Sequence, residues 1–196
     1  MKRPQIGDVY YTKVPNGYKL YQWAYSIPRK GEYIRVFPGL YETLPSQIDK
    51  VVTGPHSYII SFHIRRAYRI GLANKIENCP VPNQYPFPKY SIWLKQNMRG
   101  TIDEMELRHT DDSIRTCYRF SGSSMIDLPK EFQSISLLHH NVTPNWLLYL
   151  FDIDFDLSDP EKFFPGAPGT DYELRLKEYT DIVNSAMNST TNKTKR

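Results

Sequence analysis

The first part of the chain alternates short runs of aromatic and β-branched residues with turn residues. The runs cover residues 8–14, 18–27 and 32–37. Between them lie Pro15-Asn16-Gly17, in which Asn-Gly favours the positive φ angles of a tight hairpin turn, and a second turn sequence from Pro28 to Gly31. This pattern predicts an antiparallel β-meander.

A short helix and another strand follow the meander. Pro45 suits a first helical turn, and residues 46–52 predict a helix that ends at Gly54-Pro55. Residues 57–64 return to strand composition. Four prolines in the nine positions from Pro80 to Pro88 then exclude a helix or a central strand, so we expect an extended segment that buries its aromatic side chains.

The second half of the chain carries two further strand patterns around one ambiguous run. Residues 101–120 predict two polar strands that flank a turn. The apolar run 146–151 fits a strand or a short helix, because Thr143-Pro144 is a plausible helix start. From Phe151 to Leu157 apolar and acidic residues alternate strictly, which predicts a half-buried strand whose other face holds Asp152, Asp154 and Asp156.

A C-terminal helix is predicted by apolar residues at spacings of three and four. Asp171 can cap this helix, and its apolar stripe consists of Tyr172, Leu176, Tyr179, Val183 and Met187. The sequence therefore predicts an α+β protein that is dominated by β-structure, with a curved antiparallel sheet or partial barrel and a packed C-terminal helix.

We expect one domain over residues 1–188. Within it, a β region covers residues 5–95, and additional strands with the C-terminal helix cover residues 101–188. Residues 189–196 are polar and rich in lysine, which predicts a frayed tail.

The composition favours a folded protein without a membrane span or a disulfide scaffold. The chain has 196 residues, of which 40% are hydrophobic and 23% charged, enough to build a core. No stretch approaches the roughly 20 apolar residues of a membrane span, and no apolar signal core follows Met1, so we expect a cytoplasmic protein without membrane contact. Cys79 and Cys117 are too few for a disulfide scaffold and predict packing residues.

Charge is distributed unevenly along the chain. Residues 1–100 hold 15 basic and 5 acidic side chains, whereas residues 101–196 hold 10 basic and 16 acidic ones, and the net charge is +4. This distribution fits a basic surface for an acidic partner, an acidic surface for a basic partner, or two halves that attract each other when packed.

Two clusters are candidate partner-binding sites. The basic one contains Arg65, Arg66 and Arg69, and arginine with nearby tyrosines could also grip nucleic acid. The acidic one contains Asp152, Asp154 and Asp156. These aspartates resemble the start of a calcium loop, but Leu157 and Phe163 stand where that loop needs glycine and glutamate, so we predict no metal and interpret them as a docking or solvated face.

Catalytic patterns are lacking in the sequence. There is no Gly-x-Ser-x-Gly elbow and no phosphate-binding glycine loop, and the neighbouring His139 and His140 would point apart on a strand. We therefore predict no catalytic residues, no metal and no cofactor. An enzyme would require the fold to bring histidines and carboxylates together in a cleft.

Five segments follow one another in a distinctive order over residues 5–95: Gly7-Asp8-Val9-Tyr10, Pro15-Asn16-Gly17-Tyr18, the apolar strand and basic segment of 58–69, Ile70-Gly71-Leu72 with Asn74-Lys75-Ile76, and the proline-rich Pro80 to Tyr90. In the order and spacing of these segments the chain resembles the immunity protein 26 family of bacterial polymorphic toxin systems. The resemblance implies a non-enzymatic immunity protein that binds and neutralises a cognate protein toxin.

The alternative hypothesis is a nucleic-acid-binding module that uses the basic, tyrosine-rich first half. The sequence leaves open the identity of the toxin, the oligomeric state and which of the two charged clusters contacts a partner.

Overall fold

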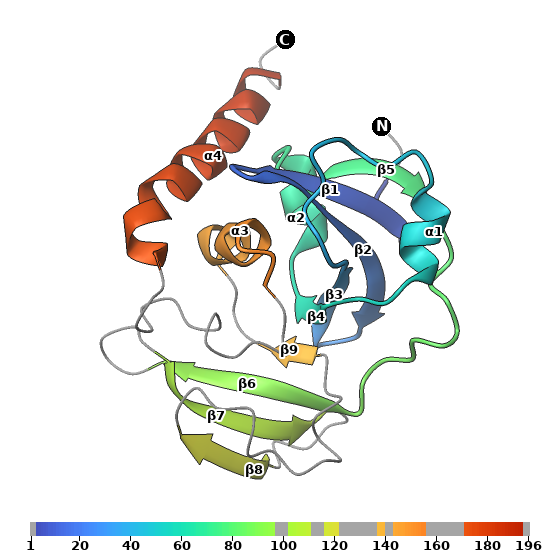
Figure 1. The fold of residues 1–196 in the computed structure, drawn as a ribbon, viewed down its shortest axis with the longest axis vertical. Helices are drawn as coiled ribbons and strands as arrows, with labels where there is room; N and C mark the ends of the chain where they lie inside the picture. Colours follow the sequence, from blue (N-terminus) through green and yellow to red (C-terminus); the bar gives the residue numbers. More distant parts are fainter. Residues whose placement is uncertain are drawn as a thin grey trace.

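The described part of the chain forms an α+β fold dominated by one large sheet (Figure 1). This computed structural model describes residues 3–96, 102–110, 116–121, 137–139, 143–155 and 171–193. The strands are β1 (Asp8–Val14), β2 (Gly17–Ile27), β3 (Gly31–Val36), β4 (Tyr58–Ser61), β5 (Asn74–Asn78), β6 (Tyr90–Gln96), β7 (Ile102–His109), β8 (Thr116–Ser121) and β9 (Leu137–His139). The helices are α1 (Ile48–Thr53), α2 (Ile64–Arg69), α3 (Pro144–Asp152) and α4 (Tyr172–Lys193).

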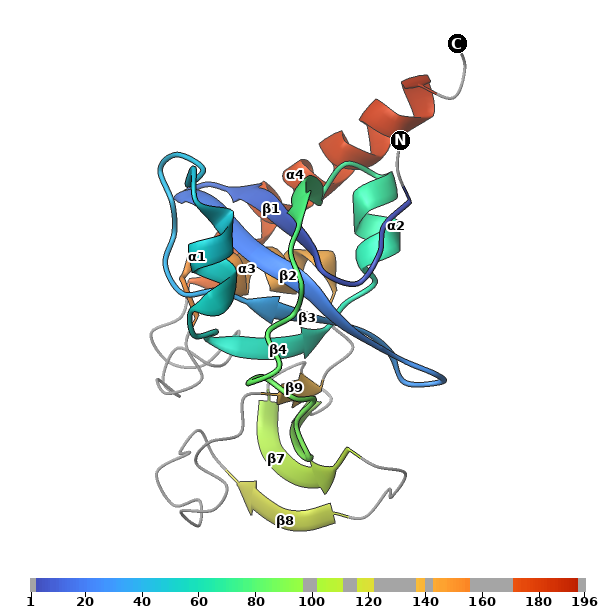
Figure 2. The ribbon, with the colours of Figure 1, turned by 90° about the vertical axis from the view of Figure 1, so that its right-hand side faces the viewer.

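The sheet consists of two antiparallel parts joined by one short strand. Its order within the described residues is β5-β1-β2-β3-β4-β9-β6-β7-β8, an open arrangement and not a closed barrel. The five strands from β5 to β4 are antiparallel, as are β6, β7 and β8, whereas β9 lies parallel to both β4 and β6. Figure 2 shows β9 at the junction, between the β1–β4 region above and β7 and β8 below.

The predicted meander is confirmed. Val14 pairs with Gly17 at the tip of the β1–β2 hairpin, and Ile27 pairs with Gly31 at the next turn. The predicted short helix before Gly54 is α1, and the two polar strands expected in residues 101–120 are β7 and β8.

Both faces of the β1–β4 sheet are covered. One face packs against α2, α3 and Tyr179 of α4, and its buried sheet residues are Tyr10, Val14, Tyr21, Trp23, Ile34, Val36, Tyr58 and Ile60. On the other face Val9, Leu20 and Phe37 pack against α1 and Cys79. The proline-rich segment also covers part of the sheet, because the centres of the Phe87 and Tyr33 rings lie 5.1 Å apart. This contact agrees with the expectation that the segment buries aromatic side chains.

The ambiguous apolar run is helix α3. Thr143 caps it by accepting a hydrogen bond from the Trp146 backbone N–H at 3.3 Å, and Pro144 occupies the first turn. Every residue from Trp146 to Asp152 is buried, so this helix has no exposed polar face. Its sequence therefore lacks the alternation of apolar and polar residues at helical spacing that would have predicted a helix.

The acidic strand predicted to begin at Phe151 was wrong. Phe151 and Asp152 close α3, Asp154 adopts the left-handed conformation with φ 48°, and Phe155 is fully buried. Instead of a strand, the chain turns back at the end of the helix, where the Phe155 N–H donates to the Leu150 carbonyl at 2.9 Å. Residues 156 and 157 lie outside the described part of the chain.

Helix α4 begins after Asp171 as predicted, and the Arg175 N–H donates to the Asp171 carbonyl at 3.1 Å. It packs against α3 and lies beside the tip of the β1–β2 hairpin in Figure 1. The helix continues to Lys193, past the position 189 at which a frayed tail was expected. No proline or glycine interrupts residues 171–193, so the chain offers no helix stop signal there.

A buried carboxylate ties both C-terminal helices to the first hairpin. Asp152 accepts hydrogen bonds from the Asn16 backbone N–H at 2.9 Å and from the Tyr179 hydroxyl at 2.9 Å. Its Oδ2 also lies 2.6 Å from Arg175 Nη1, and the Asp152 side chain has no exposed surface. One carboxylate therefore connects α3, α4 and the β1–β2 turn.

Replacing Asp152 tests this connection. The Asp152→Ala variant leaves three donors without their acceptor, and we expect the free energy of unfolding in urea to fall by about 3 kcal/mol, as for other broken buried pairs. The matched control is Asp171→Asn, because Asp171 also faces Arg175, at 3.6 Å, but is 49% exposed, and asparagine keeps a side-chain oxygen that can cap α4. That variant should lose less than about 1 kcal/mol. Equal losses in the two variants would contradict the assignment.

Candidate functional site

Helix α2 carries the basic cluster and follows β4 directly. The strand predicted over residues 57–64 ends at Ser61, because the chain turns at His63 and the Ala67 N–H donates to the His63 carbonyl at 3.0 Å. Ile64 and Ala67, three residues apart, point into the core. The remaining positions of this two-turn helix place Arg65, Arg66 and Arg69 on the exposed side.

Two side chains hold Arg65 in place at the surface. Its Nε lies 2.9 Å from Glu32 Oε1, and its guanidinium stands 5.0 Å from the centre of the Trp23 ring. The side chain is still 64% exposed. Because an ion pair and an aromatic contact fix its orientation, Arg65 is largely ordered before any partner arrives.

Arg66 lies at the centre of the basic cluster. A shallow cleft of about 360 Å³ is lined by Glu32, His63, Arg65, Arg66 and Arg69. The lining of this cleft thus holds three arginines and a single glutamate. Among the described residues, no carboxylate forms an ion pair with Arg66.

A second cavity adjoins the cationic cleft and is largely apolar. It measures about 310 Å³ and lies between α2, the start of α3 and the second half of α4. His63 and Arg66 belong to the walls of both cavities. We call the two together the α2 site. Its apolar lining residues are Phe62, Ala67, Ile70, Leu72, Pro144, Val183 and Met187.

Gly71 brings the chain after α2 back beneath this cavity. Its φ of +80° lies in the left-handed region, which ends the helix and lets the Leu72 N–H donate to the Ala67 carbonyl at 3.0 Å. A larger residue would be strained at this φ. The position of Leu72 in the cavity wall depends on that turn.

The acidic candidates do not join the arginines. Asp152 is used in the interior connection described above. Asp154 pairs with the fully buried ammonium of Lys19 and accepts the Gly39 N–H at 3.0 Å. Asp156 lies outside the described residues. The Lys19–Asp154 pair agrees with the interpretation that the basic and acidic halves attract each other, although the exposed arginines of α2 do not take part in it.

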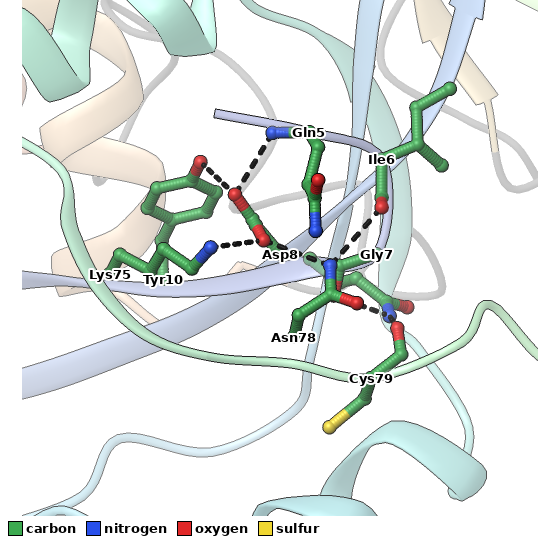
Figure 3. A network of polar contacts seen from close by, with 9 residues as sticks. Gln5, Ile6, Gly7, Asp8, Tyr10, Lys75, Asn78 and Cys79 are labelled. Carbon is green, nitrogen blue, oxygen red and sulfur yellow. Dashed lines mark hydrogen bonds and ion pairs between the residues drawn. The ribbon is translucent and has the colours of Figure 1, made fainter. Parts of the chain in front are cut away.

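Figure 3 shows a polar network around Asp8, which combines a buried carboxylate, a lysine and a tyrosine. Asp8 Oδ1 lies 2.5 Å from Lys75 Nζ, and Asp8 Oδ2 accepts hydrogen bonds from the Gln5 N–H and the Tyr10 hydroxyl. Burial alone would raise the pKa of Asp8, but Lys75 and the hydrogen bonds hold it below its ordinary value. Burial and the nearby carboxylate raise the pKa of Tyr10.

This network is a structural connection between β1 and β5. Asn78 donates to both Asp8 Oδ1 and the Ile6 carbonyl, and the Cys79 N–H donates to the Gly7 carbonyl at 3.0 Å (Figure 3). Gly7 has φ +94°, and a Cβ there would lie 2.7 Å from the Cys79 carbonyl oxygen, so only glycine fits. The motif residues around Asp8 and Lys75 therefore hold neighbouring strands together.

A second unusual feature is the buried Arg35. Its guanidinium donates to Gln22 Oε1 at 3.1 Å and to the Val52 and Gly54 carbonyls at the end of α1, and it lies 4.1 Å from the centre of the Tyr85 ring. Burial lowers the pKa of Arg35. His56 contacts the same Tyr85 ring, and burial with the charge of Arg35 lowers its pKa from 6.5 to about 4.

The remaining candidates show no reactive arrangement in the described residues. Cys79 is buried in the core as a packing residue, and burial raises the pKa of its thiol to about 12. The described part of the chain contains no group of three or more His, Cys, Asp and Glu residues able to hold a metal ion. Within the same residues, no helix combines the length and apolarity that a membrane crossing requires.

The chain was compared with protein families, curated proteins and solved structures, and none of them matches it. The resemblance to immunity protein 26 therefore stays a prediction from sequence. The Arg65, Arg66 and Arg69 cluster could be found from the sequence, but the cavity beside it could not. Its walls come from three separate segments, which begin near residues 61, 143 and 183.

The low pKa of His56 predicts how stability depends on pH. As the pH falls below 6.5, the unfolded chain takes up a proton at His56, whereas the folded protein does so only near pH 4. Stability contributed by neutral His56 is therefore complete above pH 6.5 and is lost between pH 6.5 and 4. The lowered pKa of Asp8 makes stability depend on pH only below about pH 4, which is outside most of the range from pH 6.5 to 4.

We expect the His56→Phe variant, which keeps a ring against Tyr85, to lose less stability than the wild type between pH 6.5 and 5. Urea unfolding at both pH values measures this difference, and circular dichroism at pH 7 checks that the variant folds. An unchanged pH dependence in the variant would contradict the role of His56.

Proposed function

We propose that this chain is a non-enzymatic immunity protein, which binds one protein toxin and blocks it through the α2 site. The observation that carries the proposal is the cationic cleft: three exposed arginines stand on a helix whose opposite side is anchored in the core by Ile64 and Ala67. A binding protein of this kind needs a rigid scaffold and a complementary surface, and no catalytic group.

The cleft is suited to an acidic protein surface. Arginine presents a planar fork of donors that matches a carboxylate, and it is among the residues that most often dominate binding energy at protein interfaces. Arg65 is already oriented by Glu32 and Trp23, which lowers the entropy lost on binding. Net positive charge in the cleft would also speed association with an acidic partner.

The positions of the tyrosines favour a protein partner over nucleic acid. Binding to single strands without sequence preference relies on exposed aromatic rings that stack on bases. In the basic half of the chain, Tyr10, Tyr21, Tyr33 and Tyr58 are all buried in the core and cannot stack on a ligand. These four tyrosines, which contributed to the nucleic-acid hypothesis, are therefore packing residues.

Charge reversal tests the proposed function. We expect the triple variant Arg65→Glu, Arg66→Glu, Arg69→Glu to abolish growth rescue when it is co-expressed with the product of the gene next to its own. Its affinity for that product, measured by calorimetry, should fall at least roughly 100-fold, since two or three charged contacts reverse sign.

The matched control reverses three exposed lysines elsewhere, with Lys13→Glu, Lys50→Glu and Lys177→Glu, and so changes the net charge equally. This control should retain rescue and affinity. Rescue by both variants would contradict the assignment of the α2 site. Tight, salt-sensitive binding of the wild type to mixed oligonucleotides, without any complex with the adjacent gene product, would favour the nucleic-acid alternative.

A further inference from the structure

The apolar cavity beside the cationic cleft suggests which part of a partner this site takes. We propose that the α2 site binds a short acidic segment of the partner protein, with one large apolar side chain inserted in the cavity and neighbouring carboxylates on the arginines. This inference rests on the proposed function, because it names the element of the toxin that the same face would recognise.

The cavity has the chemistry of a side-chain pocket. Phe62 and Leu72 contribute buried apolar surface to its walls, and Val183 of α4 lines the same space. Its volume of about 310 Å³ is about ten times the share of one water in the liquid, so it accommodates an aromatic or aliphatic side chain. Burying such a side chain would strengthen binding of the segment.

Met187 gives this pocket an adaptable wall. It is 44% exposed, one of the few large hydrophobic side chains at the surface of the described residues. A flexible thioether adjusts to ligands of different shape, and methionine is favoured at surfaces that bind apolar side chains.

Arg66 links the apolar and cationic parts. It lines both cavities, together with His63, and no carboxylate of the described residues pairs with it. A partner side chain in the apolar pocket would place the adjoining residues of its segment over Arg66, Arg65 and Arg69. Charge complementarity therefore selects Asp or Glu beside the apolar residue.

The test uses three labelled pentapeptides and fluorescence polarisation. The first has tryptophan between two pairs of acidic residues, the second has alanine in place of tryptophan, and the third keeps tryptophan but replaces every acid by its amide. We expect the first to bind with a dissociation constant below about 1 mM and the other two at least roughly tenfold more weakly.

Variants of the protein locate the binding. Met187→Asp places a carboxylate in the pocket wall and should weaken binding of the first peptide at least tenfold, and Arg66→Gln should do the same by removing one cation. Met187→Leu should bind like the wild type. The control Leu174→Asp makes the same exchange at an apolar α4 side chain that is 87% exposed and lines a different groove, and it should leave binding unchanged.

The outcomes separate this inference from the proposed function. Equal binding of the tryptophan and alanine peptides, or full binding by Met187→Asp, would overturn the pocket while leaving charge-based toxin binding intact. Peptide binding as expected, together with rescue by the triple arginine variant, would instead overturn the assignment of toxin binding to the α2 site. Self-association in sedimentation that Met187→Asp abolishes and Leu174→Asp does not would make a second copy the occupant, and would also overturn the inference.

Discussion

The Asp152 carboxylate is the interaction on which the arrangement of the helices depends. It is fully buried and joins the end of α3 to Arg175 and Tyr179 of α4 and to the Asn16 turn. A buried ion pair adds little net stability compared with apolar packing, but loss of one partner leaves an uncompensated charge, so it strongly selects one geometry. The α2 site inherits this geometry because α4 supplies one wall of the pocket. Asp152 therefore helps to determine the shape of the α2 site, although it lines neither of the two cavities of that site.

The other buried charges are stabilised in different ways. Lys19 has a carboxylate, Asp154, and Asp8 has Lys75 and a set of hydrogen-bond donors. Arg35 has no carboxylate partner among the described residues, and its charge is met by an amide oxygen, two carbonyls at the end of α1 and the face of Tyr85. Carbonyl dipoles and aromatic faces compensate a cation only partly, which agrees with the lowered pKa of the guanidinium and of His56 next to it.

The structure could be predicted from the sequence where residues close together in the chain determine it. The hairpin between β1 and β2 and the C-terminal helix both follow from short-range patterns and are present as predicted. The segment after Phe151 was misjudged because a fully buried helix has no polar face, and its aspartates contact partners that are more than 100 residues away in the chain. The pocket of the α2 site could not be predicted from the sequence either, because its walls come together only when the sheet and both C-terminal helices have assembled.

The position of β9 has a consequence for synthesis of the protein. Its residues pair in parallel with Ile59 and Ile60 of β4 on one side and with Ile92 of β6 on the other. At the usual pace of translation, the ribosome reaches Leu137 on the order of 4 to 15 s after it has made β4. During that interval the hydrogen-bonding edge of an apolar strand has no partner on its own chain, and such edges readily pair with neighbouring chains. Until β9 has been made, β4 is thus open to pairing with strands of other chains.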